Sequence, residues 1–311
     1  MGIPGGLKFA FFSRGLENGL FRLRTINKRF GFTPRKQIRF IEYYLSVLKQ
    51  LDVKATFFIP ARILERYIKD IRKIESGNIE WGIHGFVHTD LSRLEFEDQR
   101  EHIAKAIDVF DRCKIPFKGF RAPYLRTNAY TFKAAASLGR FLYLSCDTVL
   151  WDDVYGQNYD YFKWVKDFYN PILHSSSASY IRTTNGIAEI PVSLPDDDTL
   201  VDRENLDVKS LLLLWKKILR SCHEKNEIFV LQLHPERIYE LDSVLFDLVK
   251  EAKSFNPPIW IATLGELAEW KNSSGRQSQR YPSPYQGLLC ITGDIDSITV
   301  TDFIIRLKEW H

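Results

Sequence analysis

Eight short runs rich in β-branched or aromatic residues alternate with helical stretches along this chain of 311 residues. Most of these runs end at or near Gly, Pro, His or Asp, as strands that stop at turns do. They predict strands at Ala55–Ile59, Glu80–His84, Phe117–Arg121, Tyr143–Cys146, Ala188–Val192, Ile228–His234, Trp260–Thr263 and Leu288–Thr292. The stretches between them predict helices at Arg35–Leu51, Phe96–Cys113, Ala129–Leu138, Val208–Lys225 and Leu241–Lys253. Strands that alternate with helices form parallel βαβ units, and eight of them favour an α/β barrel over an open sheet.

Ionisable residues gather at the ends of the predicted strands. In parallel barrels the chemistry sits at the carboxyl ends of the strands. One polar residue at a strand end means little, but here five strand ends carry one or two each. The residues at these positions are His84, Arg121, Asp147, His234, Asp294 and Asp296. The sequence therefore predicts a functional site at one rim of an apolar scaffold.

Two histidines, His84 and His88, stand four residues apart at the end of the second predicted strand. Neutral imidazoles at this spacing can face one cation, although such a pair alone is more often a hydrogen-bonded part of the structure. A catalytic zinc site uses three protein ligands, so a third ligand is expected from a neighbouring strand end. Asp294 and Asp296 offer carboxylates there, and His234 offers a proton donor. Together these residues favour a metal-assisted amide hydrolase.

Five short motifs resemble those of the polysaccharide deacetylase superfamily, also called the NodB-homology or carbohydrate esterase 4 superfamily. They follow one another in the family's order over residues 35–270. The motifs are Lys54-Ala-Thr-Phe-Phe58, His84-Gly-Phe-Val-His88, Arg121-Ala-Pro-Tyr124, Asp147 with Trp151, and Leu231-Gln-Leu-His234. The resemblance implies a distorted (β/α)7–8 barrel with the NodB-like deacetylase fold. It also implies a divalent metal, with Zn²⁺ as the expected ion, and removal of an acetyl group from an N-acetylated sugar.

The family's first motif, T-F-D-D-G, is missing from its usual place. The sequence there reads Phe11-Phe12-Ser13-Arg14-Gly15, which offers no aspartate. Thr292-Gly293-Asp294-Ile295-Asp296 resembles the motif in the form T-x-D-x-D, and it precedes an amphipathic run, Thr299–Trp310. The last strand of a barrel lies beside the first, and chain termini often lie close together, so circular permutation is tolerated. We therefore expect a circularly permuted deacetylase. In it residues 288–311 supply the first barrel strand and a helix, and residues 272–287 form the linker to them.

The resemblance implies a role for each residue of the metal site. His84, His88 and Asp296 would hold the metal, and Asp294 would be the base that activates water. The two aspartates could exchange these roles, because Ile295 separates them whereas the family's pair is adjacent.

The resemblance also implies roles around the substrate. His234 would protonate the leaving amine, with Asp147 as the carboxylate that keeps it charged. Arg121 would orient the base, and the backbone N–H of Tyr124 would stabilise the oxyanion. Trp151 would line the wall that faces the sugar.

Two other functions remain open from the sequence. An inactive homologue that binds glycan would follow if Asp294 and Asp296 belonged to a tail far from the histidines. A glycosyltransferase would use Asp294-x-Asp296 as a D-x-D motif for a metal–nucleotide sugar, but it would leave the histidines unexplained. Asp196-Asp197-Asp198 is typical of a loop. It would bind a metal only if Asp294 and Asp296 do not.

Positive charge concentrates near the N-terminus. Residues 1–40 hold nine Lys/Arg against Glu17 alone, a net of +8, and the remainder carries a net of −4. Residues 16–32 read as a basic amphipathic helix within an N-terminal segment, 1–34, that precedes the barrel at 35–311. Such a helix packs over a barrel or meets an anionic membrane surface. Nucleic acid is not expected, because no recognition motif is present and the body of the chain is acidic.

Four cysteines, Cys113, Cys146, Cys222 and Cys290, lie far apart without a C-x-x-C pair, so buried reduced thiols are expected. No run approaches the roughly 18 apolar residues of a spanning helix. The start, Met1–Gly6, lacks the features of a secretory signal. We expect a cytoplasmic protein that is peripheral to the membrane only if the basic helix binds there.

Overall fold

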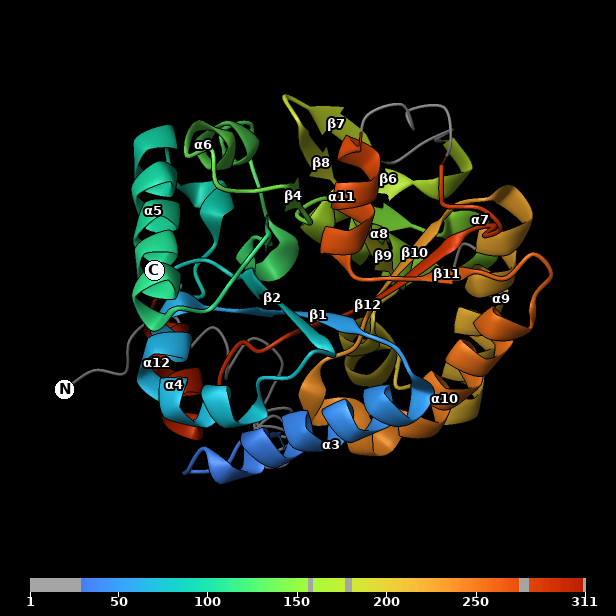
Figure 1. Cartoon of the computed structure of the whole chain (residues 1–311), viewed down its shortest axis with the longest axis horizontal. Helices are drawn as coiled ribbons and strands as arrows, with labels where there is room; N and C mark the ends of the chain where they lie inside the picture. Colours follow the sequence, from blue (N-terminus) through green and yellow to red (C-terminus); the bar gives the residue numbers. More distant parts are fainter. Residues whose placement is uncertain (1–28, 156–158, 177–180, 274–279, 310–311) are drawn as a thin grey trace.

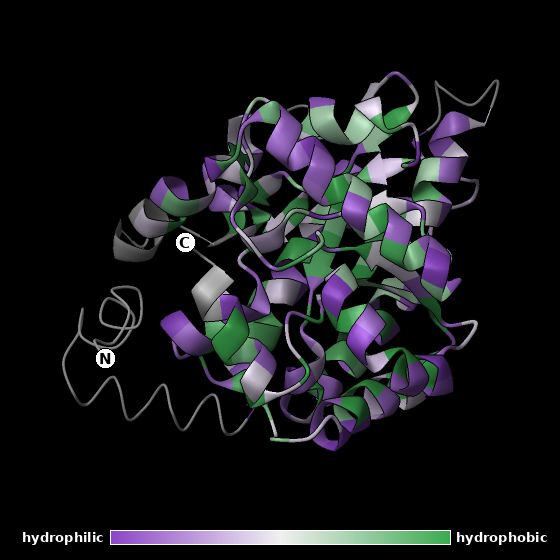
Figure 2. Cartoon of the chain, turned by 90° about the vertical axis from the view of Figure 1, so that its left-hand side faces the viewer, coloured by the Kyte–Doolittle hydropathy of each residue, from purple (hydrophilic) through white to green (hydrophobic). Residues whose placement is uncertain are grey.

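A computed structural model describes residues 29–155, 159–176, 181–273 and 280–309. These residues form a curved sheet of mainly parallel strands with helices packed around it (Figure 1). Apolar residues fill the interior, and hydrophilic residues cover the outer faces of the helices (Figure 2). None of the described helices is long and apolar enough to cross a membrane. Residues 16–28 of the predicted helix at 16–32 lie outside the described residues.

The larger sheet has the strand order β10-β12-β1-β2-β3-β4-β8-β7, with β11 also paired to β12. Its strands are β1 (Ala55–Ile59), β2 (Ile79–Ile83), β3 (Gly119–Phe120), β4 (Tyr143–Leu144), β7 (Arg182–Thr184), β8 (Ile187–Glu189), β10 (Ile228–Gln232), β11 (Trp260–Ile261) and β12 (Leu288–Asp294). A smaller sheet has the order β6-β5-β9. Its strands are β5 (Thr148–Leu150), β6 (Ile172–Leu173) and β9 (Val192–Leu194). Apart from the β7–β8 hairpin, the pairings are parallel.

The two sheets together curve into a distorted barrel. The chain passes from the larger to the smaller sheet twice, from β4 to β5 and from β8 to β9. β4 pairs with β8 before this break, and β5 pairs with β9 after it. β9 lies against β10, where the backbone N–H of Val230 donates to Ser193 Oγ at 3.1 Å. The barrel expected from the alternating pattern is therefore confirmed, with its distortion at the break between β4 and β5.

Helices surround the strands in chain order. The helices are α3 (Arg35–Leu51), α4 (Ala61–Ile74), α5 (Phe96–Cys113), α6 (Thr131–Ser137), α7 (Asp152–Tyr155), α8 (Tyr159–Tyr169), α9 (Val208–Lys225), α10 (Ile238–Ser254), α11 (Leu264–Asn272) and α12 (Val300–Glu309). Along the outside, α9 packs on α10, α10 on α3, α3 on α4, α4 on α5 and α5 on α6. α11 lies against β4 and β8 (Figure 1). The four cysteines are buried and free, as expected.

β12 is an interior strand of the larger sheet, between β10 and β1, although it is the last strand along the chain. It pairs in parallel with β10 on one edge and with β1 on the other. Its seven residues, Leu288–Asp294, are all buried. The segment after it returns to the described start of the chain: Val300 N–H donates to Gly31 O at 2.9 Å, and Phe303 stacks on Phe30 with ring centroids 5.6 Å apart. The two ends of the described chain therefore meet beside the sheet.

Candidate functional site

The carboxyl ends of four strands on one side of the larger sheet carry the side chains of the site. Asp294 is the last residue of β12, and His84 follows β2 directly. Arg121 follows β3, and His234 lies two residues beyond the end of β10. Because the strands are parallel, these ends share one rim of the barrel. Arg121, His84 and His88 thereby contact aspartates that lie about 170 to 210 positions later in the sequence.

Three side chains at this rim converge on one point. Asp296 Oδ1 lies 3.2 Å from His88 Nε2 and 3.5 Å from His84 Nε2. These three ligand atoms all lie within 4.8 Å of one another. Both histidines are almost completely buried. The arrangement places two imidazoles and one carboxylate where a single cation could contact all of them.

The hydrogen bonds of the two histidines fit a cation at this point. His84 Nδ1 lies 3.0 Å from the carbonyl oxygen of Arg121, which can only accept, so Nδ1 donates. The other ring nitrogen, Nε2, faces Asp296. Burial is the largest influence on His88 and lowers the pKa of its imidazole to about 4. Asp296 Oδ1, which faces both imidazoles, is buried without a hydrogen-bond partner among the described residues, and so is His88 Nδ1. Two His with one Asp is a ligand set that Zn²⁺ takes.

His102, which the sequence did not single out as functional, fixes the backbone between His84 and His88. Gly85 has φ +79°, and a Cβ there would lie 2.8 Å from His102 Nε2. Phe86 N–H donates to the same His102 nitrogen at 2.9 Å. Burial lowers the pKa of His102 to about 4, which keeps that nitrogen an acceptor. His102 on α5 therefore holds the turn that presents His88.

Asp294 is held at both of its oxygens. Arg121 Nη1 donates to Asp294 Oδ1 at 2.9 Å, and Gln232 Nε2 donates to Oδ2 at 2.9 Å. Arg121 is fully buried, and it also donates to Ser145 Oγ and lies over the ring of Phe58. These contacts fix the carboxylate in one orientation, 3.8 Å from His84 Nε2.

Asp296 is also held by Arg306, which sequence reasoning missed. Arg306 Nη1 donates to Asp296 Oδ2, so the two oxygens of this carboxylate face different partners. Burial alone would raise the pKa of Asp296, but His88 and Arg306 outweigh it and keep that pKa well below its usual range. Arg306 lies on α12, which follows β12 after a short loop, and this connection places its side chain beside Asp296.

His234 pairs with Asp197, and the predicted pairing with Asp147 is wrong. His234 Nδ1 lies 2.8 Å from Asp197 Oδ1, and His234 N–H donates to Oδ2 at 2.7 Å. Burial alone would lower the pKa of His234, but the carboxylates of Asp197 and Asp198 outweigh it and raise that pKa well above its ordinary value. Asp147 instead accepts from Arg182 at 3.0 Å. β5 continues the strand beyond Asp147, so this residue does not reach the rim.

Two arginines neutralise the acidic loop that carries Asp197. Arg237 Nε lies 3.3 Å from Asp197 Oδ2, and its Nη2 contacts both Asp198 and Asp202. Arg29 contacts Asp198 from the start of the described chain. Asp197, Asp198 and His234 lie close enough to hold a cation. The two guanidinium groups already occupy these carboxylates, so the loop serves His234 rather than a metal.

The two predicted substrate residues differ in their surroundings. Trp151 is fully buried and stacks on His174 with ring centroids 3.9 Å apart, so the prediction that it lines a sugar-facing wall is wrong. Tyr124 lies edge-on to His88 at 4.2 Å. Tyr124 and Leu125 have φ of 60° and 52°, which is uncommon for residues other than glycine. Such backbone conformations concentrate at functional sites.

Comparison with known proteins identifies relatives of part of the sequence. Residues 37–141 match the family model described as polysaccharide deacetylase. A peptidoglycan deacetylase-like protein of Gibberella zeae is 30% identical over 103 residues, which are 32% of this chain and 30% of that protein. The chain thus aligns with less than a third of the length of that relative.

Two solved structures have a similar fold over most of the chain. One is a Mycobacterium smegmatis protein assigned by inference to the polysaccharide deacetylases, with 20% identity and a TM-score of 0.60 over 89% of this chain and 86% of that one. The other is an allantoinase, with 19% identity and a TM-score of 0.57 over 77% and 72%. These similarities confirm the barrel fold. They leave the substrate open, since one fold hosts many activities.

Proposed function

We propose that this chain, whose residues 37–141 match the polysaccharide deacetylase family model, is a metal-dependent hydrolase that removes acetyl groups from an N-acetylated carbohydrate. The observation that carries the proposal is one compact cluster. It contains a three-residue ligand set, a carboxylate held by arginine, and a histidine held by a carboxylate. The ligand atoms of His234, Asp294 and Asp296 all lie within 4.8 Å of one another. Amide hydrolysis needs a base and an acid at such a spacing.

The contacts favour one assignment of the two aspartates. Asp296 Oδ1 faces both imidazoles, as a third ligand would, whereas both Asp294 oxygens are oriented by Arg121 and Gln232. A divalent cation held by His84, His88 and Asp296 would supply a Lewis acid that polarises the acetamide carbonyl and lowers the pKa of water. Asp294 is then the base that takes the proton from the attacking water.

The acid is His234. Asp197 keeps its imidazole protonated at Nδ1, so that the N–H at Nε2 can deliver a proton to the leaving amine. The backbone N–H of Tyr124 would donate to the developing oxyanion. This proton lets the C–N bond break, which gives a free amine and acetic acid. Acetic acid then loses a proton and the amine takes one up, so the products are acetate and an ammonium group on the sugar.

Chelation tests the proposal directly. The purified protein is expected to release acetate from N-acetylglucosamine oligomers, to lose about 90% or more of this activity when dialysed against a chelator, and to regain it with Zn²⁺. His88→Ala should bind no Zn²⁺ at equimolar concentration. His223→Ala, a matched change at the end of α9, should bind it as the wild type does. Retention of full activity by a metal-free sample, or no acetate release from the metal-loaded protein, would refute the proposal.

We also propose that the chain is a circular permutation of the family's order. Two observations support this: β12 lies between β10 and β1, and the match to the family model starts only at residue 37. A rearranged chain with residues 280–311 ahead of residue 29, joined by about ten Gly/Ser residues and ending at residue 273, tests it. Such a linker can reach up to about 33 Å. We expect cooperative unfolding, with a Tm within about 8 °C of the natural order, and retained Zn²⁺ binding. Failure of the purified rearranged chain to bind Zn²⁺ or unfold cooperatively would argue against permutation.

A further inference from the structure

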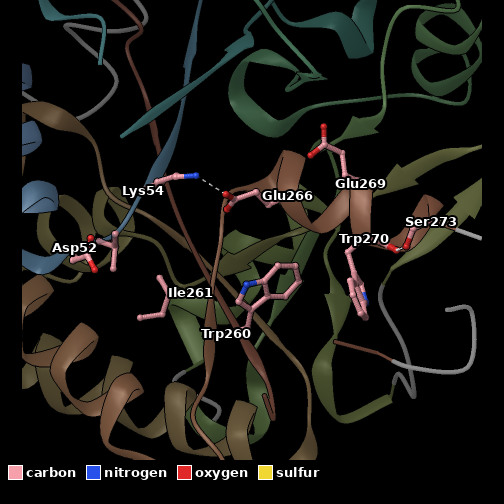
Figure 3. Close-up of a pocket in the computed structure, with 9 residues that line it drawn as sticks. Asp52, Lys54, Trp260, Ile261, Glu266, Glu269, Trp270 and Ser273 are labelled. Carbon is pink, nitrogen blue, oxygen red and sulfur yellow. Dashed lines mark hydrogen bonds and ion pairs between the residues drawn. The ribbon is translucent and has the colours of Figure 1, made fainter. Parts of the chain in front are cut away.

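A cavity of about 480 Å³ has Trp260 and Trp270 in its lining (Figure 3). Asp52, Val53 and Lys54, which directly precede β1, also line it, so it lies at the amino ends of the strands, opposite the rim with the candidate metal site. It forms where β1 diverges from β12: β1 pairs with the last three residues of β12, and β11 takes the same edge beside the first two. Leu288, at the start of β12, is six residues from Asp294. That separates the cavity from the candidate base by about 20 Å along the strand. A ligand in this cavity therefore cannot contact the reacting atoms.

Two tryptophans form an aromatic corner in the cavity. Trp260 on β11 and Trp270 on α11 have ring centroids 6.3 Å apart and planes inclined at 70°. In Figure 3 the indole of Trp260 lies between Ile261 and Trp270. Both tryptophans are partly exposed, and Tyr285 stacks against Trp260. A six-membered ring placed in this corner would contact both indoles, and the apolar C–H face of a pyranose suits such a surface.

The charge around the corner favours a cation over an anion. The ionisable lining residues are Asp52, Lys54, Glu266 and Glu269. Lys54 pairs with Glu266 at 2.7 Å, and Lys118, just outside the cavity, pairs with Glu269 at 2.7 Å. Counting Lys118, three carboxylates thus meet two ammonium groups. The faces of indole rings also attract cations.

We propose that this cavity is a non-catalytic carbohydrate site that binds free-amino sugar units, the ammonium form of the sugar. The choice of ligand rests on the proposed function, because deacetylation produces this group. The ring of the amino sugar would lie in the corner of Trp260 and Trp270, with its ammonium directed to the excess carboxylate. The protein would in this way hold an already deacetylated part of a chain while the distant centre acts on another part.

Calorimetric titration with hexamers of glucosamine and of N-acetylglucosamine tests the site. The glucosamine hexamer should bind at least about tenfold more tightly than the acetylated one. Trp260→Ala should weaken glucosamine-hexamer binding about tenfold, and Asp52→Asn, an exposed and fold-neutral change, about threefold. Tyr130→Ala, which removes an aromatic ring exposed elsewhere, should leave binding unchanged. Hydrolysis of N-acetylglucosamine dimers, which are too short to reach the cavity from the metal centre, should stay within about twofold of wild type in both pocket variants.

The outcomes separate this site from the proposed function. Preference for the acetylated hexamer, no binding of either hexamer, or Trp260→Ala and Asp52→Asn proteins that bind like the wild type would overturn the site. Slower dimer hydrolysis in a correctly folded Asp52→Asn protein would also count against it, because the cavity would then not be independent of the centre. Binding of the glucosamine hexamer through Trp260 by a protein that releases no acetate would leave the site standing and refute the proposed function.

Discussion

Asp294→Asn should reduce acetate release by about 10²–10⁴-fold, because it removes the base but keeps the shape of the side chain. The amide oxygen of asparagine can still accept from Arg121, whose other hydrogen bonds to Ser145 remain. The change leaves the buried guanidinium of Arg121 without its carboxylate, which costs up to about 3–5 kcal/mol of stability. The rate should therefore be measured on protein shown by circular dichroism to be folded at the assay temperature. Zn²⁺ binding should weaken far less than the rate falls.

Glu80→Gln is the matched control for Asp294→Asn. Glu80 is a partly buried carboxylate, but it lies near the amino end of β2, where it accepts from Tyr143 Oη at 2.7 Å. Its replacement should change the rate by no more than about twofold, since it lies at the rim opposite the site. If Asp294→Asn and Glu80→Gln lost activity equally, Asp294 would be structural and the assignment of the base would be wrong.

Asp197→Asn should lower the rate by about 10²-fold or more at pH 8 and should shift the basic limb of the pH–rate profile to lower pH. His234 acts in its protonated form, and Asp197 is one of the carboxylates that raise its pKa. Without this charge the pKa of His234 falls, so the imidazolium is lost at a lower pH. The rate of the variant should therefore recover partly as the pH is lowered toward 6. A pH–rate profile for kcat measures both effects.

Asp147→Asn separates the two candidate partners of His234. Asp147 pairs with the exposed Arg182, whereas His234 pairs with Asp197, so replacement of Asp147 should leave the basic limb in place. Its rate should stay within a few-fold of wild type. A shift of the limb in Asp147→Asn but not in Asp197→Asn would restore the pairing expected from the sequence.

The parts of the fold that repeat a local pattern could be predicted from the sequence. Arg35–Leu51, Phe96–Cys113 and Val208–Lys225 are helices with the expected bounds, and Ala55–Ile59 is a strand with the expected bounds. The helix at Leu264–Asn272 was missed, although Thr263 and Glu266 form a capping box that signals its start. Periodicity and strand ends are local properties, so one sequence carries them.

Partners across the barrel could not be predicted in the same way. Asp196, Asp197 and Asp198 look alike in the sequence, and only the packing of β9 against β10 decides that Asp197 meets His234. Asp147 follows a predicted strand directly, but the chain forms a further strand, Thr148–Leu150. The carboxyl end of the strand therefore lies three residues beyond Asp147. Spacing along the chain carries no information on either point, because both depend on how neighbouring strands are staggered.

The position of β12 has a consequence for synthesis of the protein. A ribosome makes residues 288–296 after β1 and β10, so both of these strands leave the exit tunnel with an unpaired edge facing the other. Open edges bind other chains and promote aggregation. We therefore expect the chain to be most prone to aggregation during synthesis until β12 is made and pairs with both edges.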